Sequence, residues 1–181
     1  MKSLSAPNAE PTLHWSTAED DAACGRLIGI TLRAAPYRRA LARAMPFIAN
    51  DAPMHIPSQH QRIIACAGQQ IIGAAQFAPE AGYLDYLFVT PAHQGQRLGA
   101  RLLREVEHHA KQPLRLVVLS INKPARRFYE RAGYVIERRE REDDWYGQRV
   151  VWITMAYRTR PASSLNIPIR READPPPTHP A

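Results

Sequence analysis

Residues 83–110, YLDYLFVTPAHQGQRLGARLLREVEHHA, decide the fold of this chain. Tyr83 to Val89 is rich in aromatic, branched and other apolar residues, as a largely buried strand should be, and Thr90-Pro91 ends it. After the loop QGQRLG, apolar residues recur at the 3.6-residue spacing of one helix face, at Leu98, Leu102, Leu103, Val106 and Ala110. The stretch therefore predicts a strand, a glycine-containing loop and a helix.

The beginning of that helix predicts an anion-binding site. The first turn of a helix has unpaired backbone N–H groups and the positive end of the macrodipole. Gly95 and Gly99 lack a Cβ, so a pyrophosphate can approach the backbone, and Gln94, Arg97 and Arg101 add polar or positive groups. An ordinary strand, turn and helix, with glycines for turn geometry, is the alternative at this point.

Two well-known phosphate loops do not fit this stretch. Walker A ends in Gly-Lys-Ser/Thr, whereas Gly99 is followed by Ala100-Arg101. The dinucleotide fingerprint needs an acidic residue about 20 positions further on, at the end of the next strand. This chain has Ser120 there.

The loop resembles the pyrophosphate loop of the GNAT superfamily of acyl-CoA-dependent N-acyltransferases. The family pattern is Gln/Arg-x-x-Gly-x-Gly/Ala, after a strand that ends in Val-x-Pro. Gln94, Leu98 and Gly99 fall in register with it, and Arg97 occupies the position where the family usually has its middle glycine.

A second stretch, SINKPARRFYERAGY at residues 120–134, resembles the second GNAT signature, Asn-x-x-Ala-x-x-Phe-Tyr-x-x-x-Gly-Phe/Tyr. The match is at Asn122, Ala125, Phe128, Tyr129, Gly133 and Tyr134. Two motifs in the right order and at the right separation are much more specific than either alone. The resemblance covers roughly Arg62 to Tyr157.

The resemblance implies an α/β (α+β) fold: a mixed, mostly antiparallel sheet of about seven strands, with a splayed central parallel pair and helices on both faces. We expect a single domain over residues 12–157, a flexible arm over 1–11 and a disordered, Pro- and Arg-rich tail over 158–181.

Patterns elsewhere in the chain predict the remaining elements. We expect a short strand at Leu13 to Trp15 and a helix from Ser16 or Thr17 to about Leu32, with Ala23, Leu27 and Ile30 inside. A second helical stretch carries Tyr37, Leu41, Met45 and Ile48, and residues 50–58 form a loop. Residues 114–119 are a strand, and two hairpins are expected, 62–67 with 71–78 and 134–141 with 150–157 across a turn at 143–148.

The resemblance also implies where acetyl-CoA binds. The pantetheine arm would pair with the backbone of Leu87, Phe88 and Val89, and Asn122 would lie near the pantetheine or the thioester. Arg126 is among the basic residues that the resemblance places around the cofactor. The pyrophosphate would lie on the loop and first turn formed by Gln94, Gly95, Gln96, Arg97, Leu98, Gly99 and Ala100.

Tyr129 is the expected general acid, because a tyrosine hydroxyl stays protonated at neutral pH and can protonate the departing thiolate. Its alternative role is packing beside Phe128 on the helix. Asp85, on the central strand, is the expected base; Tyr83, His14, His55 or a chain of water molecules are the alternatives. No metal is expected, since His108 and His109 are adjacent and point to different faces of their helix.

The function expected from these motifs is N-acetyltransfer from acetyl-CoA to a primary amine of a small molecule or peptide. The alternatives are a macromolecular acceptor, such as a protein or aminoacyl-tRNA, and a non-catalytic acyl-CoA sensor. The net charge is +7, but Arg138 to Glu142 alternates in sign, so nucleic acid is not the favoured partner. We expect a cytoplasmic protein with two buried thiols and no membrane span, and a homodimer is a candidate assembly.

Overall fold

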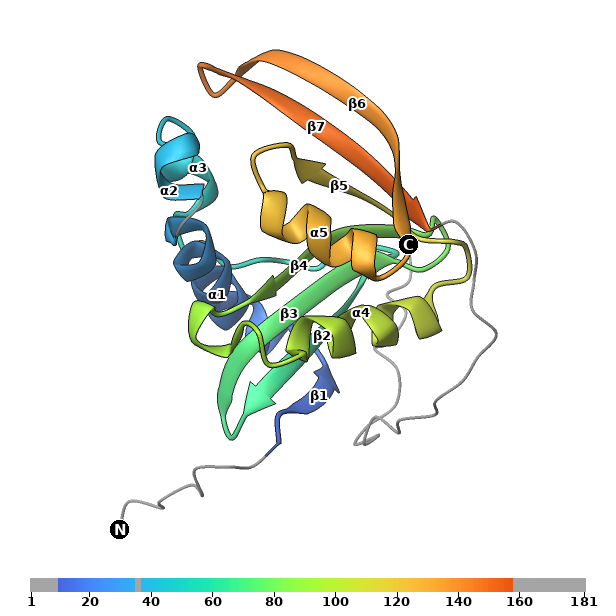
Figure 1. Ribbon diagram of the computed structural model, residues 1–181. Coiled ribbons are helices and arrows are strands. Elements are labelled where there is room, and N and C mark those ends of the chain that lie inside the picture. The colour runs from blue at the N-terminus through green and yellow to red at the C-terminus, as the bar shows by residue number, and fades with distance from the viewer. Residues whose placement is uncertain (1–9, 35–36, 158–181) are drawn as a thin grey trace.

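The computed structural model describes residues 10–34 and 37–157. The expected C-terminal tail, 158–181, and most of the expected N-terminal arm lie outside these described residues. The described chain folds around one seven-stranded sheet in the order β1-β2-β3-β4-β5-β7-β6 (Figure 1). The strands are β1 (Thr12–Trp15), β2 (Gln61–Ala67), β3 (Gln70–Ala78), β4 (Tyr83–Val89), β5 (Arg115–Leu119), β6 (Tyr134–Trp145) and β7 (Gln148–Tyr157).

Helices cover both faces of the sheet, as expected. Residues that are adjacent in β2, such as Ile63 and Ile64, belong to different apolar clusters, because side chains alternate along a strand. Ile63 packs with α4 (Leu98–His109) and α5 (Lys123–Arg131), and Ile64 packs with α1 (Asp21–Arg33). The buried residues of α4 are Leu98, Leu102, Leu103 and Val106, the set that its periodicity predicted.

Helix α1 starts later than expected, and its inner face differs. Residues Ala18–Asp20 form a 3₁₀ turn, and Asp20 Oδ2 accepts a hydrogen bond of 2.8 Å from the backbone N–H of Thr17. The buried apolar side chains of α1 are Cys24, Leu27, Ile28 and Leu32, a stripe at helical spacing that leaves Ile30 outside it, 50% exposed.

Residues 37–48 do not form one helix. They form two single turns, α2 (Tyr37–Ala40) and α3 (Met45–Ile48). Pro46 lies near the beginning of α3, where its missing N–H is not needed, but inside a continuous helix its ring would clash with the preceding turn. The break lets Leu41 and Ala44 pack against Leu119 and Val150 from the other half of the molecule.

Strands β4 and β5 form the one parallel pair, and they separate almost at once. Their register contains two residue pairs, Tyr83 with Arg115 and Leu84 with Leu116. On its other side β4 carries a bulge, because Phe77 pairs with Leu84 but Gln76 pairs with Tyr86. Asp85 is thus the extra residue, placed where β4 leaves β5. A bulge bends the strand and turns neighbouring side chains to the same face.

The last hairpin is longer than expected. Strand β6 runs through the charged segment to Trp145, and the turn shrinks to Tyr146 and Gly147, both with positive φ (48° and 74°), as a tight two-residue hairpin turn requires. The charges are tolerated because β6 is the outermost strand and most of its side chains are exposed. Strand β7 lies between β5 and β6, so its backbone is paired on both sides from Trp152 to Ala156 and that part is not available to a second subunit.

Candidate active site

The separation of β4 from β5 leaves one side of the β4 backbone without a partner strand. Leu87, Phe88 and Val89 pair with Ala75, Ala74 and Gly73 of β3, while β5 pairs with β4 no further than Leu116. Leu87 and Val89 pack on the face of α4 and α5, and Phe88 on the face of α1. The expected pantetheine-binding residues therefore present backbone groups to the gap between the strands.

The loop before α4 is the segment where an anion site was expected. Gly95 and Arg97 have positive φ angles of 79° and 62°, and no side chain caps the helix. Arg97 thus takes the left-handed conformation in which glycine would be unstrained. The side chains of Gln94 and Gln96 bond to the loop itself, at Val89 O (2.9 Å) and Ala92 O (3.1 Å). The backbone N–H groups at the beginning of α4 are consequently the donors available to an anion.

Gly99, in the first turn of α4, lies close to both β4 and α5. A Cβ at Gly99 would lie 3.7 Å from Leu87 Cδ2 of β4 and 3.7 Å from the Phe128 ring of α5. Gly99 and Leu98 therefore lie between β4 and α5, and Ala100 is exposed beside them. The uncapped turn, the glycine and the side of β4 that has no partner strand therefore lie close to one another.

Asn122 begins α5 and joins it to α2. Its Oδ1 accepts a hydrogen bond of 3.2 Å from the backbone N–H of Ala125, so the side chain caps the helix. Because Oδ1 takes that role, Nδ2 is the group that donates to the hydroxyl of Tyr37. Burial raises the pKa of Tyr37 to about 12, although the bond from Asn122 opposes the shift.

Tyr129, the expected general acid, is buried on α5 at 6% exposure. Its ring meets those of Phe128 and Tyr134 edge-on, with centroids at 5.0 Å and 5.6 Å. Its hydroxyl makes no hydrogen bond to any residue in the described ranges. Burial, followed by the influence of the Tyr37 hydroxyl, raises the pKa of Tyr129. The phenol therefore keeps its proton at neutral pH.

Arg126, one turn before Tyr129, has an enclosed Nε that forms no hydrogen bond with the described residues. The same atom lies 3.4 Å from Glu130 Oε1, which makes the two side chains an ion pair along the helix. The ion pair thus holds the Arg126 side chain along α5, in the turn between the cap residue Asn122 and Tyr129.

Asp85, the expected base, is held by two side chains. Gln76 Nε2 donates to its Oδ2 at 3.1 Å, and His60 Nε2 lies 3.5 Å from the same oxygen. His60 Nδ1 lies 3.0 Å from the carbonyl oxygen of Ser58. Because a carbonyl oxygen can only accept a hydrogen bond, Nδ1 carries a proton, and Nε2 is the nitrogen that can gain or lose a proton. His60 was not predicted from the sequence, since a single histidine before a strand has no distinguishing pattern.

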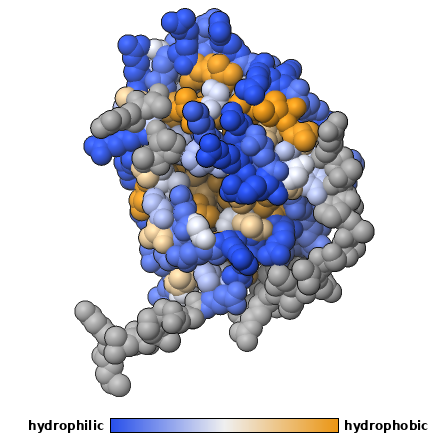
Figure 2. Space-filling view, viewed as in Figure 1, coloured by the Kyte–Doolittle hydropathy of each residue, from blue (hydrophilic) through white to orange (hydrophobic). Residues whose placement is uncertain are grey.

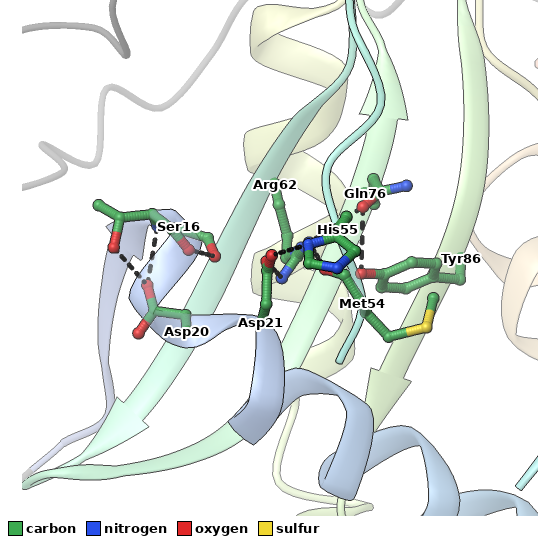
Figure 3. Close-up of polar contacts among 9 residues, drawn as sticks. Ser16, Asp20, Asp21, Met54, His55, Arg62, Gln76 and Tyr86 are labelled. Atoms are coloured by element: carbon green, nitrogen blue, oxygen red, sulfur yellow. Dashed lines mark hydrogen bonds and ion pairs between the residues drawn. The ribbon is translucent and has the colours of Figure 1, made fainter. Parts of the chain in front are cut away.

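From Gln76, the hydrogen-bond partner of Asp85, a polar network continues toward α1; Figure 3 shows Gln76, Arg62, Asp21 and His55 within it. The guanidinium of Arg62 is enclosed and reaches Gln76 Oε1 (3.4 Å), Asp21 Oδ1 (3.1 Å) and the carbonyl of Met54. His55 bonds to the other oxygen of Asp21 at 2.7 Å. His14, the other histidine considered as a base, bonds to Thr12 on β1. Neither of these two histidines contacts Asp85.

Within residues 10–34 and 37–157, no group of three or more His, Cys, Asp or Glu side chains is arranged to hold a metal ion. In that same part of the chain no helix is both long and apolar enough to span a bilayer.

Comparisons with known proteins agree with this architecture. A family model described as "Acetyltransferase (GNAT) domain" matches residues 34–158. No curated protein sequence matches the chain. Among solved structures, a GCN5-related N-acetyltransferase from Rhodopseudomonas palustris aligns with a TM-score of 0.63 at 22% identity, over 82% of this chain and 95% of its own.

Two other solved structures resemble the chain at similar levels. The yncA protein of Salmonella typhimurium, determined with its cofactor acetyl-CoA, aligns with a TM-score of 0.60 at 16% identity, over 88% of this chain and 99% of its own. The ribosomal-protein-S18-alanine N-acetyltransferase of Escherichia coli aligns at 0.58 and 17% identity, over 87% and 100%. At these identities the likeness concerns the fold.

Proposed function

Because the chain belongs to the GNAT acetyltransferase domain family, we propose that it moves an acetyl group from acetyl-CoA to a primary amine of a small molecule or peptide. The observation that carries this proposal is that the uncapped first turn of α4, Gly99, the unpaired side of β4 and Phe128 of α5 lie together, and that Tyr129 follows Phe128 in the same helix. The bound acetyl-CoA of the Salmonella relative supports acetyl-CoA as the acyl donor.

In this proposal acetyl-CoA supplies a thioester, and the residues of the chain orient it and move protons. The N–H groups at the start of α4 hold the pyrophosphate, and the backbone of Leu87, Phe88 and Val89 holds the extended arm. The amine nitrogen attacks the thioester carbonyl carbon and the C–S bond breaks, which leaves a thiolate. Tyr129 donates its proton to that sulfur.

The raised pKa of Tyr129 is compatible with this role. Burial keeps the phenol protonated before the reaction, because it disfavours the charged phenolate. For the same reason it disfavours a charged thiolate in the same cleft. Once the thiolate forms, the raised pKa of the sulfur favours transfer of the proton, whereas the raised pKa of the phenol opposes it. Burial also raises the pKa of the Cys24 and Cys66 thiols, which supports direct attack by the amine rather than an acyl-cysteine intermediate.

Asp85 removes the proton of the attacking amine, directly or through water. The bulge places it where the two central strands part, and its carboxylate keeps one hydrogen bond from Gln76. His60 lies against the same oxygen with the nitrogen that can accept a proton. The pair can therefore hold the proton that the amine loses.

Calorimetric titration of acetyl-CoA, with free CoA and ATP as comparisons, tests the proposal. We expect micromolar binding of acetyl-CoA and little binding of ATP, followed by release of free thiol when amines are added. Gly99→Glu should abolish binding by filling the gap. Gly99→Ala is the control, since its methyl group would meet Leu87 and Phe128 at an ordinary 3.7 Å. Undiminished binding by Gly99→Glu would place the cofactor elsewhere.

A further inference from the structure

A cavity of about 290 Å³ lies between the end of β5, the segment after α2 and the β6–β7 hairpin. Its apolar wall contains Leu41, Leu119 and Val150, which belong to one buried cluster. In Figure 2 hydrophobic residues gather in the upper part of the molecule, where Figure 1 places β5 and the hairpin, and hydrophilic residues surround them. The wall can therefore hold the carbon skeleton of a small ligand.

Two arginines, Arg141 of β6 and Arg149 of β7, complete the lining of this cavity. Neither makes an ion pair with a carboxylate of the described residues. Of the acidic side chains of β6 around them, Glu140 pairs with Arg138 at 2.9 Å, Glu142 accepts a hydrogen bond from Trp152 Nε1 at 2.7 Å, and Asp144 accepts one from the backbone N–H of Gly147. Asp143 is exposed close to them. The two arginines are exposed as well, so their positive charges lie at the edge of an apolar cavity and are open to a ligand. Arginine is suited to binding carboxylate or phosphate through two parallel hydrogen bonds.

The cavity adjoins the candidate active site. Ser120 and Ile121 line it and immediately precede Asn122, which caps α5 and bonds to Tyr37. Tyr37 also packs against the apolar cluster that forms the cavity wall. A molecule held by the arginines can therefore extend past Ile121 toward the Asn122–Tyr37 pair.

We propose that this cavity binds the acceptor, and that the acceptor carries an anionic group, a carboxylate or a phosphate, held by Arg141 and Arg149. The inference rests on the proposed function, since it assigns a substrate class to the same site. The volume suits a molecule about the size of an amino acid. The anionic group lies at the hairpin, the apolar part lies on Leu41, Leu119 and Val150, and the amine points toward Asn122.

Binding measured without turnover tests the inference. Calorimetry in the presence of saturating free CoA is performed with γ-aminobutyrate and ε-aminocaproate, with the uncharged carboxamide of each, and with aminopropylphosphonate. The variants are the double substitution Arg141→Gln/Arg149→Gln and the control Arg138→Gln. Arg138 has the same charge and lies three residues from Arg141 on β6, so its side chain is on the other face of the strand.

We expect the anionic probes to bind at least about tenfold more tightly than the carboxamides, a difference that is lost in the double variant and kept in Arg138→Gln. Preference for the phosphonate over the carboxylates would identify a phosphate-bearing acceptor. Equal binding of acids and amides, unchanged binding by the double variant, or no binding by any anionic probe would overturn the inference.

Acetyl-CoA affinity separates this outcome from failure of the proposed function. We expect the double variant to bind acetyl-CoA as the wild type does. If it does not, the two arginines serve the cofactor and the inference is wrong, while the acetyltransferase proposal stands. If the wild type itself does not bind acetyl-CoA, the proposed function fails, and selective binding of the anionic probes would then report on the cavity alone.

Discussion

The side-chain amide of Asn122 donates a hydrogen bond to the hydroxyl of Tyr37, a residue 85 positions away, while its oxygen caps α5. One side chain therefore fixes both the first turn of α5 and the position of α2. Since Tyr129 is on α5 and the acceptor cavity lies beside α2, this bond sets the distance between the two halves of the proposed site.

Substitutions at Asn122 measure what the cap and the bond to Tyr37 contribute together. Asn122→Ala removes the cap and the donor, and we expect it to lower the free energy of unfolding by about 2 kcal/mol. Asn122→Asp keeps an oxygen for the cap and can accept a hydrogen bond from Tyr37, so a loss below about 1 kcal/mol is expected. Urea denaturation gives both values. Equal losses in the two variants would show that capping makes no contribution.

Removing the Tyr129 hydroxyl should affect turnover rather than stability. We expect Tyr129→Phe to lower kcat by about 100-fold, the usual scale of a general acid, with acetyl-CoA affinity nearly unchanged. Tyr134→Phe is the control from the same aromatic cluster. Its hydroxyl donates to Glu107 Oε1 at 3.0 Å, so the variant should lose about 1–2 kcal/mol of stability and keep its turnover. An unaltered rate for Tyr129→Phe would exclude the assignment.

Neutralising Asp85 should produce a pH-dependent defect. Asp85→Asn can still accept the hydrogen bond from Gln76, so the fold is expected to persist, but it cannot take a proton. We expect kcat to fall by about 10- to 100-fold near neutral pH, with the loss shrinking as the acceptor amine deprotonates by itself at higher pH. Glu80→Gln, which changes an exposed ion pair with Lys111, is the matched control. A defect that is constant across pH would contradict the base role.

The left-handed conformation of Arg97 predicts opposite effects on stability and affinity. Glycine at this position removes about 1–2 kcal/mol of backbone strain from the folded state. Part of that gain is offset, because glycine also stabilises the unfolded chain by up to about 1 kcal/mol of conformational entropy. Arg97→Gly should therefore be as stable as the wild type or slightly more stable, with acetyl-CoA affinity lowered about 3- to 10-fold by the lost charge. Arg97→Ala should show the same affinity loss without the gain in stability. If Arg97→Gly binds as tightly as the wild type, the cation has no part in phosphate binding.

Glu107 should make stability depend on pH. Burial, opposed by the hydrogen bond from Tyr134, raises the pKa of Glu107, so the folded state binds its proton more tightly than the unfolded state does. The ionised carboxylate therefore lowers stability above the folded-state pKa and has no effect below the unfolded-state pKa, about 4.3. Glu107→Gln should raise stability at pH 7 and leave it unchanged well below that value. Denaturant titrations at the two pH values check this, and an equal gain at both would refute it.

The fold was predictable where the signal is local. The spacing of Leu98, Leu102, Leu103 and Val106 is a property of one helix, and the structure buries those side chains. Ile30 was assigned to the wrong face because Leu27 and Ile30, and equally Cys24 and Ile28, are at helical spacing, and only in the second pair are both side chains buried. The length of the last hairpin was wrong because exposed β6 tolerates charges that usually mark a turn. Tertiary contacts decide both which face is buried and where a strand ends.

The site was predictable where a motif names consecutive residues and unpredictable where distant segments meet. Asp85 was considered from its position on the strand, but the bulge that places it beside Gln76 is a property of two paired strands. His60 meets Asp85, and Arg141 and Arg149 meet Leu41, through the folding of separate segments. No pattern in the sequence marks such encounters.

An open sheet ordinarily has two edge strands, whose unpaired backbone groups can recruit another chain. Here the early separation of β4 from β5 creates two more edges inside the molecule, beyond the Leu84–Leu116 pair. These inner edges are recessed between α4 and α5, so a second protein strand has little access to them. A thin ligand with amide groups of its own can complete them, and in doing so it would stand in for a missing strand of the sheet.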